Sequence, residues 1–285
     1  MLPFEYILLV LSVLILISIT LTKISENLGL PALILFLVVG MLAGSDGPGK
    51  IHFDNVYIAQ YVGIVALIFI LFSGGLETKW RDVKPVMWTA FTLSTLGVVL
   101  TTAVLGIFVH YFFNLPLPES FLIGAIISST DAAAVFSVLR AKGTRLKGRI
   151  KPLLELESGS NDPAAIILTI LFIEYIQAAD VTGLRIVIFL FQQLILGTAI
   201  GIGAGKLLSI AFNKFKFSYP SLYPVFAIAS AVFVYAAAAS VGASGILAVY
   251  IAAVILGNSE FIQKKSLVRF FDGLALLGQI VVFLT

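Results

Sequence analysis

The chain has 285 residues, of which 60% are hydrophobic and only 12% are charged. That charged share is about half of what an ordinary soluble domain carries, which excludes a water-soluble globular fold. There is no cysteine, so disulfides, thiol catalysis and thiolate metal sites are excluded as well. Apolar runs of about 18 or more residues recur along the whole chain, and each is continuous rather than alternating. The composition therefore predicts an all-α polytopic membrane protein.

About ten transmembrane helices are predicted from these runs. In chain order they cover residues 5–22, 31–44, 57–73, 86–113, 119–139, 152–177, 184–211, 221–240, 244–257 and 267–285. Clusters of glycine, proline, asparagine and charged residues separate them. The first run lacks a basic residue before it and a small-x-small cleavage site after it, so it is predicted to be a retained helix. The last run reaches Thr285, and we expect further helices beyond it.

The lysines and arginines are distributed unequally between the connections. Odd-numbered connections hold 16 of them, including Lys142, Arg145 and Lys216, whereas even-numbered connections hold only Lys50 and Arg185. Positive charge accumulates on the cytoplasmic side of a membrane. We therefore expect the odd connections in the cytoplasm, the N-terminus outside and the protein in the cytoplasmic membrane. The same distribution explains the basic pI of about 9.0 without a nucleic-acid partner.

Two polar stretches interrupt apolar runs, Ser128–Ala134 and Glu155–Pro163, on either side of the basic connection Arg140–Lys151. Charged residues inside a span cost several kcal/mol unless they face water or a partner. Asp131 and Asp162 are each about 14–16 Å from the cytoplasmic face at 1.5 Å per residue, near the middle of the bilayer. Two adjacent antiparallel helices thus carry carboxylates at matching depth.

The first polar stretch favours a break in its helix. Serine, threonine and aspartate side chains bond their own backbone, so we predict non-helical backbone within 128–132 and a new helix starting near Ala132. Asp131 is interpreted both as the cap of that half-helix and as a candidate ion-binding residue. In the next helix, Pro163 cannot donate a hydrogen bond to the carbonyl of Gly159, which predicts a kink beside Asp162.

Residues four apart share a helix face, as Ser158 does with Asp162 and Glu157 with Asn161. Hydroxyl, carboxylate, carbonyl and amide oxygens should therefore converge, and such ligands suit Na⁺ or K⁺. We predict a monovalent cation at Asp162, Thr130 and Ser158. The carboxylate could hold either the cation or a proton, and competition for one site is enough for exchange. Glu157 is a supporting residue, whose burial would require a cationic partner, one that could lie beyond residue 285.

Around these polar stretches, Ser128–Phe136 and Leu154–Pro163 resemble the two core motifs of NhaP-type antiporters, which belong to family 1 of the monovalent cation:proton antiporters. The similarity extends over essentially the whole chain and is closest to the bacterial potassium/proton branch. Further similar segments are Gly40–Gly44, Phe72–Glu77, Lys147–Leu154 and Phe270–Ala275. The resemblance implies that Asn161 and Asp162 carry transport, that Thr130 and Asp131 belong to the broken helix, and that exchange is electroneutral. It also implies an inverted-repeat fold of about thirteen helices, of which this chain lacks the last three.

The resemblance further implies a division of labour among the helices and a homodimer. Residues 1–84 and 217–285 would form a dimerising scaffold, 85–178 a moving core and 179–216 a linker helix. The implied substrates are protons and K⁺ or Na⁺, K⁺ being favoured, and no cofactor is implied. A channel or an organic-solute carrier is the alternative, but neither a selectivity filter nor aromatic groups at mid-depth are visible. An intramembrane enzyme lacks a nucleophile–base pair, and we expect no enzymatic activity.

Overall fold

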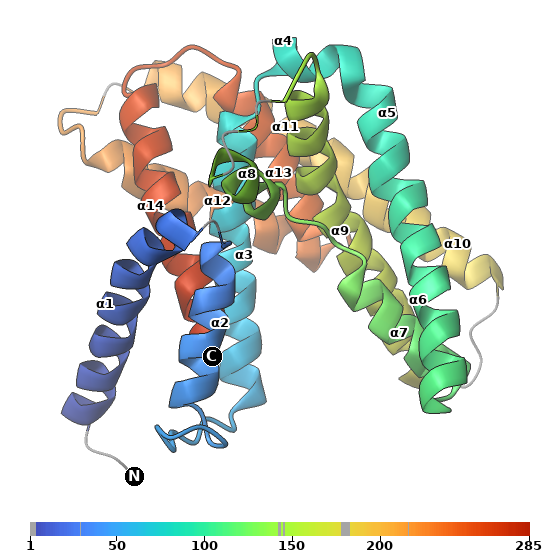
Figure 1. Ribbon diagram of the computed structural model, residues 1–285. Helices are drawn as coiled ribbons and strands as arrows, with labels where there is room; N and C mark the ends of the chain where they lie inside the picture. Colours follow the sequence, from blue (N-terminus) through green and yellow to red (C-terminus); the bar gives the residue numbers. More distant parts are fainter. Residues whose placement is uncertain (1–3, 29, 142–143, 145, 178–182, 216) are drawn as a thin grey trace. The chain divides into compact units, whose positions relative to one another are not determined.

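The computed structural model describes residues 4–28, 30–141, 144, 146–177, 183–215 and 217–285. The described residues are helical apart from turns and one isolated bridge between Gly44 and Ile51 (Figure 1). The chain divides into two compact units, which are described separately below. The predicted cytoplasmic residues Lys142, Arg145 and Lys216 lie outside the described residues.

The first unit contains residues 1–70, 131–146 and 271–285. It includes α1 (Phe4–Leu28), α2 (Ala32–Ala43), most of α3 (Val56–Glu77), α8 (Ala132–Ala141) and the end of α14 (Lys264–Leu284). Gly40 of α2 lies against the carbonyl of Phe283, and Gly278 lies against Ala66, where an added Cβ would be 3.2 Å from that side chain. Small residues thus let the backbones approach closely, as is common between helices in membranes.

The second unit contains residues 71–130 and 147–270. One long helical stretch runs through α4 (Trp80–Val83), the 3₁₀ turn η1 (Lys84–Val86), α5 (Met87–Thr92), the π-helical turn η2 (Leu93–Gly97) and α6 (Val98–Phe113). α7 (Leu117–Ile127) packs against α6 and α9 (Ile150–Gln177), and α9 also contacts α5 and η2. Wide π-turns are frequent near functional sites.

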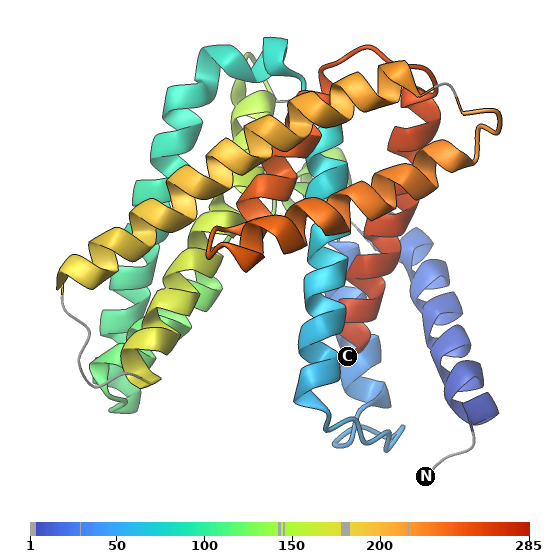
Figure 2. The ribbon, with the colours of Figure 1, turned by 180° about the vertical axis from the view of Figure 1, so that it is seen from behind.

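The remaining helices of this unit include one short helix that is mostly buried, α13 (Gly245–Gly257). They are α10 (Gly183–Phe191), the π-helical turn η3 (Gln192–Leu196), α11 (Gly197–Lys214), α12 (Leu222–Ser240) and α13 (Gly245–Gly257). Figure 2 shows α11 and α12 from behind. A stripe of small residues on α11, Gly197, Gly201 and Gly205, is buried and lies against Ser244, Ala248 and Ala252. The stripe is a helix-packing surface.

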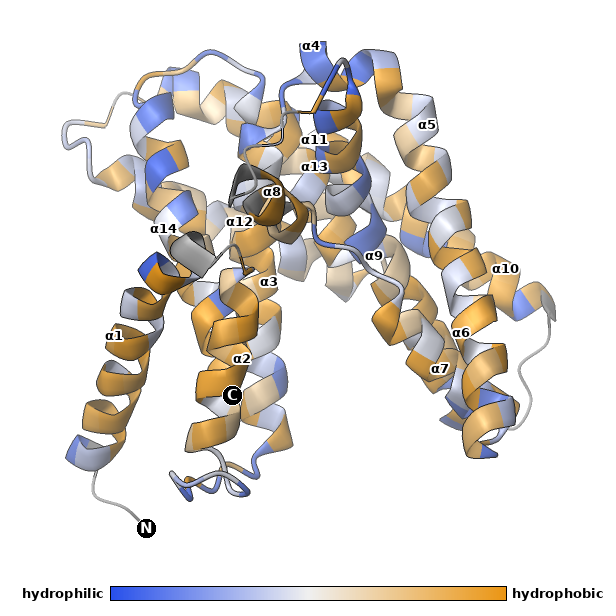
Figure 3. Ribbon diagram, in the orientation of Figure 1, coloured by the Kyte–Doolittle hydropathy of each residue, from blue (hydrophilic) through white to orange (hydrophobic). Residues whose placement is uncertain are grey.

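Six helices in the described part of the chain are long and apolar enough to cross a membrane. They cover Glu5–Ser25, Val56–Glu77, Trp80–Phe113, Leu184–Lys214, Leu222–Ser240 and Lys264–Leu284. Apolar residues cover these helices, and polar residues gather mainly at ends and connections (Figure 3). Large apolar side chains such as Trp88 and Tyr111, at 76% and 77% exposed, would be buried in a soluble protein. The protein is therefore a multi-pass membrane protein.

The predicted spans coincide with helices in the described residues, with ends shifted by a few residues and three larger differences. The fourth span begins at Trp80 rather than residue 86, because Pro85 is tolerated in the first turn of a helical segment. α1 continues to Leu28, past the predicted end at residue 22. The fifth span is divided into α7 and α8, as its polar stretch predicts.

Candidate functional site

The break between α7 and α8 lies at residues 128–131, which confirms the predicted discontinuous helix. Ser128 is buried, and its hydroxyl donates to the carbonyl of Ala125 at 2.7 Å. The hydroxyl thereby satisfies a carbonyl at the end of α7 that the next turn would otherwise have used. Ser129 and Thr130 follow as non-helical residues, with their backbone and side-chain groups available to α9.

α9 passes this break and is joined to it by side-chain hydrogen bonds. The hydroxyl of Ser158 donates to the backbone carbonyl of Thr130 at 3.0 Å. The hydroxyl of Thr130 in turn donates to Glu157, with its Oγ1 at 3.2 Å and 3.1 Å from the two carboxylate oxygens. Residues of α9 thus take the place of the missing helical partners, which is how a membrane protein keeps irregular backbone paired.

Asn161 is completely buried and every polar atom of its amide is used. Its Nδ2 donates to Glu157 Oε1 at 3.0 Å and to the hydroxyl of Thr130. Its Oδ1 accepts from the hydroxyl of Ser129 at 3.3 Å. An amide cannot titrate in the physiological range. Asn161 therefore braces the broken segment against α9.

Asp162 is the acidic residue next to this brace, and it is half-buried. Its Oδ1 accepts a hydrogen bond from Ser129. The Ser129 hydroxyl has one proton and two carboxylate or amide acceptors, so it couples Asn161 to Asp162. Ser129 is absent from the predicted site residues, although it belongs to the polar stretch that predicted the break. The motif points to its neighbours Thr130 and Asp131, and sequence alone does not show which hydroxyl faces α9.

Two predicted residues have surroundings that differ from the rest. Two neutral donors, Thr130 and Asn161, reach the carboxylate of Glu157, and no cationic partner is placed beside it among the described contacts. Asp131 is exposed and belongs to the first unit, whereas the other site residues belong to the second. It directly precedes α8, and its backbone carbonyl accepts from Val135 at 3.4 Å, as expected at a helix start.

The structure therefore brings together five of the six predicted site residues, Thr130, Glu157, Ser158, Asn161 and Asp162, and adds Ser129. The gathered atoms are hydroxyl, carbonyl, amide and carboxylate oxygens, which are hard ligands. Within the described residues there is no group of three or more histidine, cysteine, aspartate or glutamate side chains arranged for a metal. The set is suited to one small monovalent cation or one proton.

Comparison with known proteins places the chain in a family. Residues 12–284 match the model of the sodium/hydrogen exchanger transmembrane family. The chain is 42% identical over 276 residues to the K(+)/H(+) antiporter NhaP of Alkalimonas amylolytica, covering 97% of this chain and 48% of that protein. It is 39% identical to the K(+)/H(+) antiporter NhaP2 of Shewanella sp. MR-4, covering 94% of this chain and 46% of that one. The chain thus spans about half the length of the curated relatives it matches.

Solved structures give the same assignment. The sodium proton antiporter MjNhaP1 of Methanocaldococcus jannaschii at pH 8 superposes with a TM-score of 0.83 at 26% identity, covering 96% of this chain and 68% of that one. An electron-microscopy structure of MjNhaP1 gives a TM-score of 0.80 at 24% identity, with 99% and 69% covered. The helical fold is therefore the fold of NhaP antiporters. The chain belongs to the sodium/hydrogen exchanger transmembrane family, as its NhaP-type motifs predicted.

Proposed function

We propose that this chain belongs to a secondary transporter that exchanges a monovalent cation for a proton at Asp162. The supporting observation is the position of this half-buried carboxylate, hydrogen-bonded to Ser129 in the break between α7 and α8. Non-helical backbone at membrane depth is tolerated where it is buried in protein or lines a water-filled cavity. A carboxylate at such a place can bind a proton or a cation, one at a time.

The ligands of the cation are proposed to be Asp162, Thr130 and Ser158, with Ser129 as an addition from the structure. In the described contacts, Ser158 donates to the Thr130 carbonyl. A cation bound to that carbonyl would release the Ser158 hydroxyl, so that both oxygens turn toward the ion. Asn161 and Glu157 hold Thr130 in place during this change. We retain Asp131 as a candidate ligand from the sequence resemblance.

Exchange is proposed to be electroneutral, one cation for one proton. Asp162 is the titratable member of the Asn161–Asp162 pair, since the amide of Asn161 is committed to Thr130 and Glu157. The carboxylate is neutralised by one proton or by one monovalent cation, so both crossings carry the same net charge. The membrane potential, about 2.3 kcal/mol per charge at 100 mV, then has little influence on direction.

K⁺ is the favoured substrate. Two relatives at 42% and 39% identity are named K(+)/H(+) antiporters. MjNhaP1, at 26% identity, is named a sodium proton antiporter. Residue types do not separate the two ions, because coordination geometry decides between them. The higher identity supports K⁺, and Na⁺ is the second candidate.

The wider architecture is also a proposal. Residues 1–84 and 217–285 would serve as a dimerising scaffold, 85–178 as the moving core and 179–216 as the linker, within an inverted-repeat fold of about thirteen helices. Movement of the core would carry Asp162 between the two faces. Positive charge in the odd connections supports an outside N-terminus. A cysteine at Thr144 should react only from the cytoplasm and one at Asp54 only from outside, and the reverse result would overturn this orientation.

Exchange itself is tested in vesicles that contain the complete protein and a pH-sensitive dye. Addition of K⁺ to acid-loaded vesicles should relieve quenching, with Na⁺ and Li⁺ added separately for comparison. A potential-sensitive dye should show no change in the same experiment. Failure to respond to any of the three ions would refute the proposed function, and a transport-driven potential would refute electroneutral exchange.

A further inference from the structure

Lys206 is a charged residue on the exposed side of α11. This helix packs against α13 through its buried glycine stripe, and Lys206 lies on the other side of the helix. Its neighbours one turn away in each direction, Ile202 and Ile210, are 39% and 56% exposed. Residues four apart share a helix face. Lys206 therefore interrupts an apolar stripe that points away from α13, toward the lipid.

The length of the span places Lys206 inside the membrane, close to one surface. The span Leu184–Lys214 has 31 residues and is about 46 Å long, compared with about 30 Å of hydrocarbon. A helix of that excess length tilts in the bilayer. Lys206 precedes Lys214 by eight residues, which is about 12 Å along the helix axis and less than that in depth. Its flexible side chain can therefore extend its ammonium group to the headgroup level.

Aromatic residues at the end of α11 mark the same membrane surface independently. Phe212 is buried, with its ring centroid 5.0 Å from that of Phe261 and 5.2 Å from that of Phe226. Tyr219, in the connection that follows, is 68% exposed. Exposed tyrosines collect at the interface between lipid and water. The connection after α11 thus lies at the headgroup level, and Lys206 lies on its hydrocarbon side.

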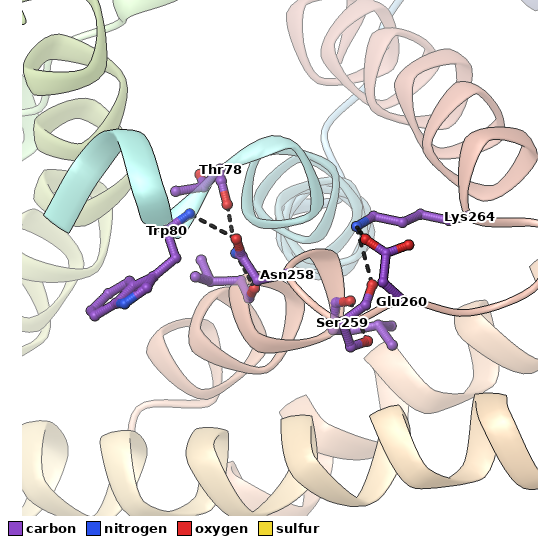
Figure 4. Close-up of polar contacts among 8 residues, drawn as sticks. Thr78, Trp80, Asn258, Ser259, Glu260 and Lys264 are labelled. Carbon is purple, nitrogen blue, oxygen red and sulfur yellow. Dashed lines mark hydrogen bonds and ion pairs between the residues drawn. The ribbon is translucent and has the colours of Figure 1, made fainter.

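The surrounding helices offer Lys206 no carboxylate. Residues 181–259 contain no aspartate or glutamate, and they include α12, α13 and η3, which pack on α11. Among the described residues, no ion pair includes Lys206. Lys264 differs, because it donates to the Ser259 carbonyl at 3.1 Å and lies 4.0 Å from Glu260 (Figure 4). Lys206 is therefore a positive charge that the described part of the protein does not neutralise.

A lipid-facing lysine needs an anion at the depth that its ammonium group reaches. A leucine at this position would avoid the cost of placing a charge beside hydrocarbon. The anionic group present at that depth is the phosphate of a phospholipid, whose acyl chains would cover Ile202 and Ile210. In a zwitterionic lipid the headgroup cation already balances the phosphate, whereas an anionic lipid keeps a net negative charge. Charge complementarity therefore selects an anionic phospholipid.

Two further polar residues lie on the headgroup side of Lys206. Asn213 is exposed and follows Lys206 by seven residues, two turns further along the same face. Its Nδ2 donates to the Ser209 carbonyl at 2.9 Å. This bond uses one of the two N–H groups of the amide, so within the described contacts the other remains for a phosphate oxygen. Lys214, the last residue of α11, is also exposed and adds a second positive charge.

We propose that Lys206, Asn213 and Lys214 form a binding site for the headgroup phosphate of an anionic phospholipid, whose acyl chains lie along the apolar stripe of α11. In the proposed orientation this lipid belongs to the cytoplasmic leaflet. The site is separate from Asp162 and does not depend on exchange. A lipid bound there fixes the depth of α11, because its phosphate stays at the membrane surface while its chains contact the helix.

The first test uses the complete protein, purified in detergent and stripped of lipid. Its unfolding temperature is measured with added phosphatidylglycerol, with phosphatidylcholine of the same acyl chains, or with inorganic phosphate. A ligand that binds the folded state raises this temperature by mass action. Phosphatidylglycerol should raise it at least twice as much as either alternative. An equal rise with phosphatidylcholine would refute recognition of charge, and an equal rise with phosphate alone would refute the assignment to a lipid.

The second test removes the charge of Lys206. The apparent affinity for phosphatidylglycerol, obtained from the same temperature shifts, should fall at least about 5-fold in Lys206→Gln, the factor that corresponds to about 1 kcal/mol for one lysine near a membrane surface. Lys206→Arg keeps the charge and should stay within about twofold of wild type. The lipid-free Lys206→Gln protein should unfold at the wild-type temperature. A clear decrease there would mean that Lys206 pairs within the protein, which would overturn the proposal.

Lys265→Gln is the matched control. Lys265 is an exposed residue at the start of α14, and the charge distribution predicts the same membrane side for it as for the end of α11. The variant makes the same change in net charge, and its affinity for phosphatidylglycerol should stay within about twofold of wild type. Equal losses in Lys206→Gln and Lys265→Gln would indicate a diffuse attraction between lipid and protein, and would overturn the site.

Discussion

α9 has two unlike neighbours within two turns. Toward the α7–α8 break it presents Glu157, Ser158 and Asn161, which are hydrogen-bonded to Ser129 and Thr130. Toward α13 it presents Gly159, which has no side chain, and the ring of Tyr250 occupies the space that a side chain there would take. The first contact is specific because polar groups are paired, and the second because no space is left. Binding chemistry and positional precision are therefore supplied by different neighbours of one helix.

The largest effect is expected from Asp162→Asn. The two side chains have nearly the same volume, and Asn can still accept from Ser129, so the fold should be kept. The group that alternates between proton and cation is removed, so exchange should fall by at least about 100-fold, to the background of empty vesicles. Dye dequenching with K⁺ and Na⁺ measures this. Substantial exchange in this variant would place the ion carrier on another residue.

A smaller but still large effect is expected on the other side of the helix, from Gly159→Ala. The new methyl group would overlap the Tyr250 ring, so α9 or the ring must shift, at a cost of about 1–3 kcal/mol. We expect a lower unfolding temperature together with reduced exchange. Gly203→Ala of α11 is the matched control, because an added Cβ there meets nothing within 4 Å. Equal effects in the two variants would show that Gly159 is not a tight contact.

Ser129→Ala tests the hydroxyl that links Asn161 to the carboxylate of Asp162. It removes the hydroxyl that reaches both Asn161 and Asp162 and leaves the Thr130 contacts in place. The loss of one hydrogen bond, about 0.5–1.5 kcal/mol, should raise the apparent cation KM about 2- to 10-fold. Ser240→Ala at the exposed end of α12, whose hydroxyl donates only within its own turn, should have no effect on KM. If Ser129→Ala leaves the apparent cation KM unchanged, Ser129 is not part of the ion site.

The smallest effect is expected at the exposed start of α9. Lys151 lies 3.5 Å from Glu155, and the two side chains are 65% and 44% exposed. Exposed pairs of this spacing contribute about 0.3–0.5 kcal/mol. Lys151→Gln should therefore change the unfolding temperature by less than about 1 °C and leave exchange unchanged. A strong effect would mean that the charges at this end of α9 take part in transport.

The sequence predicts one side of this comparison well and the other poorly. Polar residues inside apolar runs are conspicuous because they are costly there, so the break near Ser128 and the helix bearing Asp162 could both be placed in advance. The choice among neighbouring hydroxyls could not be made, since Ser129 and Thr130 both carry a hydroxyl and the sequence does not show where the non-helical backbone directs each one. The contact of Gly159 with Tyr250 joins residues far apart in the chain, and an apolar helix gives no periodic signal of which side chain meets a glycine.

The two π-helical turns and the early start of the helix at Trp80 were also not predicted. A π-turn adds one residue to a helix without changing its hydrophobic character, so composition does not reveal it. Charged and proline residues at Lys84 and Pro85 suggest a turn, but the structure continues through them in a 3₁₀ turn. In both places tertiary packing decides between backbone conformations of similar local stability.

The shortness of α13 has a consequence for how the protein is made. With 13 residues it is about 20 Å long, less than the hydrocarbon thickness of about 30 Å. Distant parts of the chain contact both of its flanks: Gln193 donates to the connection before it, and Asn258 reaches the segment after α3. These partners are available only once the neighbouring helices have assembled. We therefore expect α13 to reach its final depth only during assembly of the surrounding helices. Its placement would be a late step in the biogenesis of the protein.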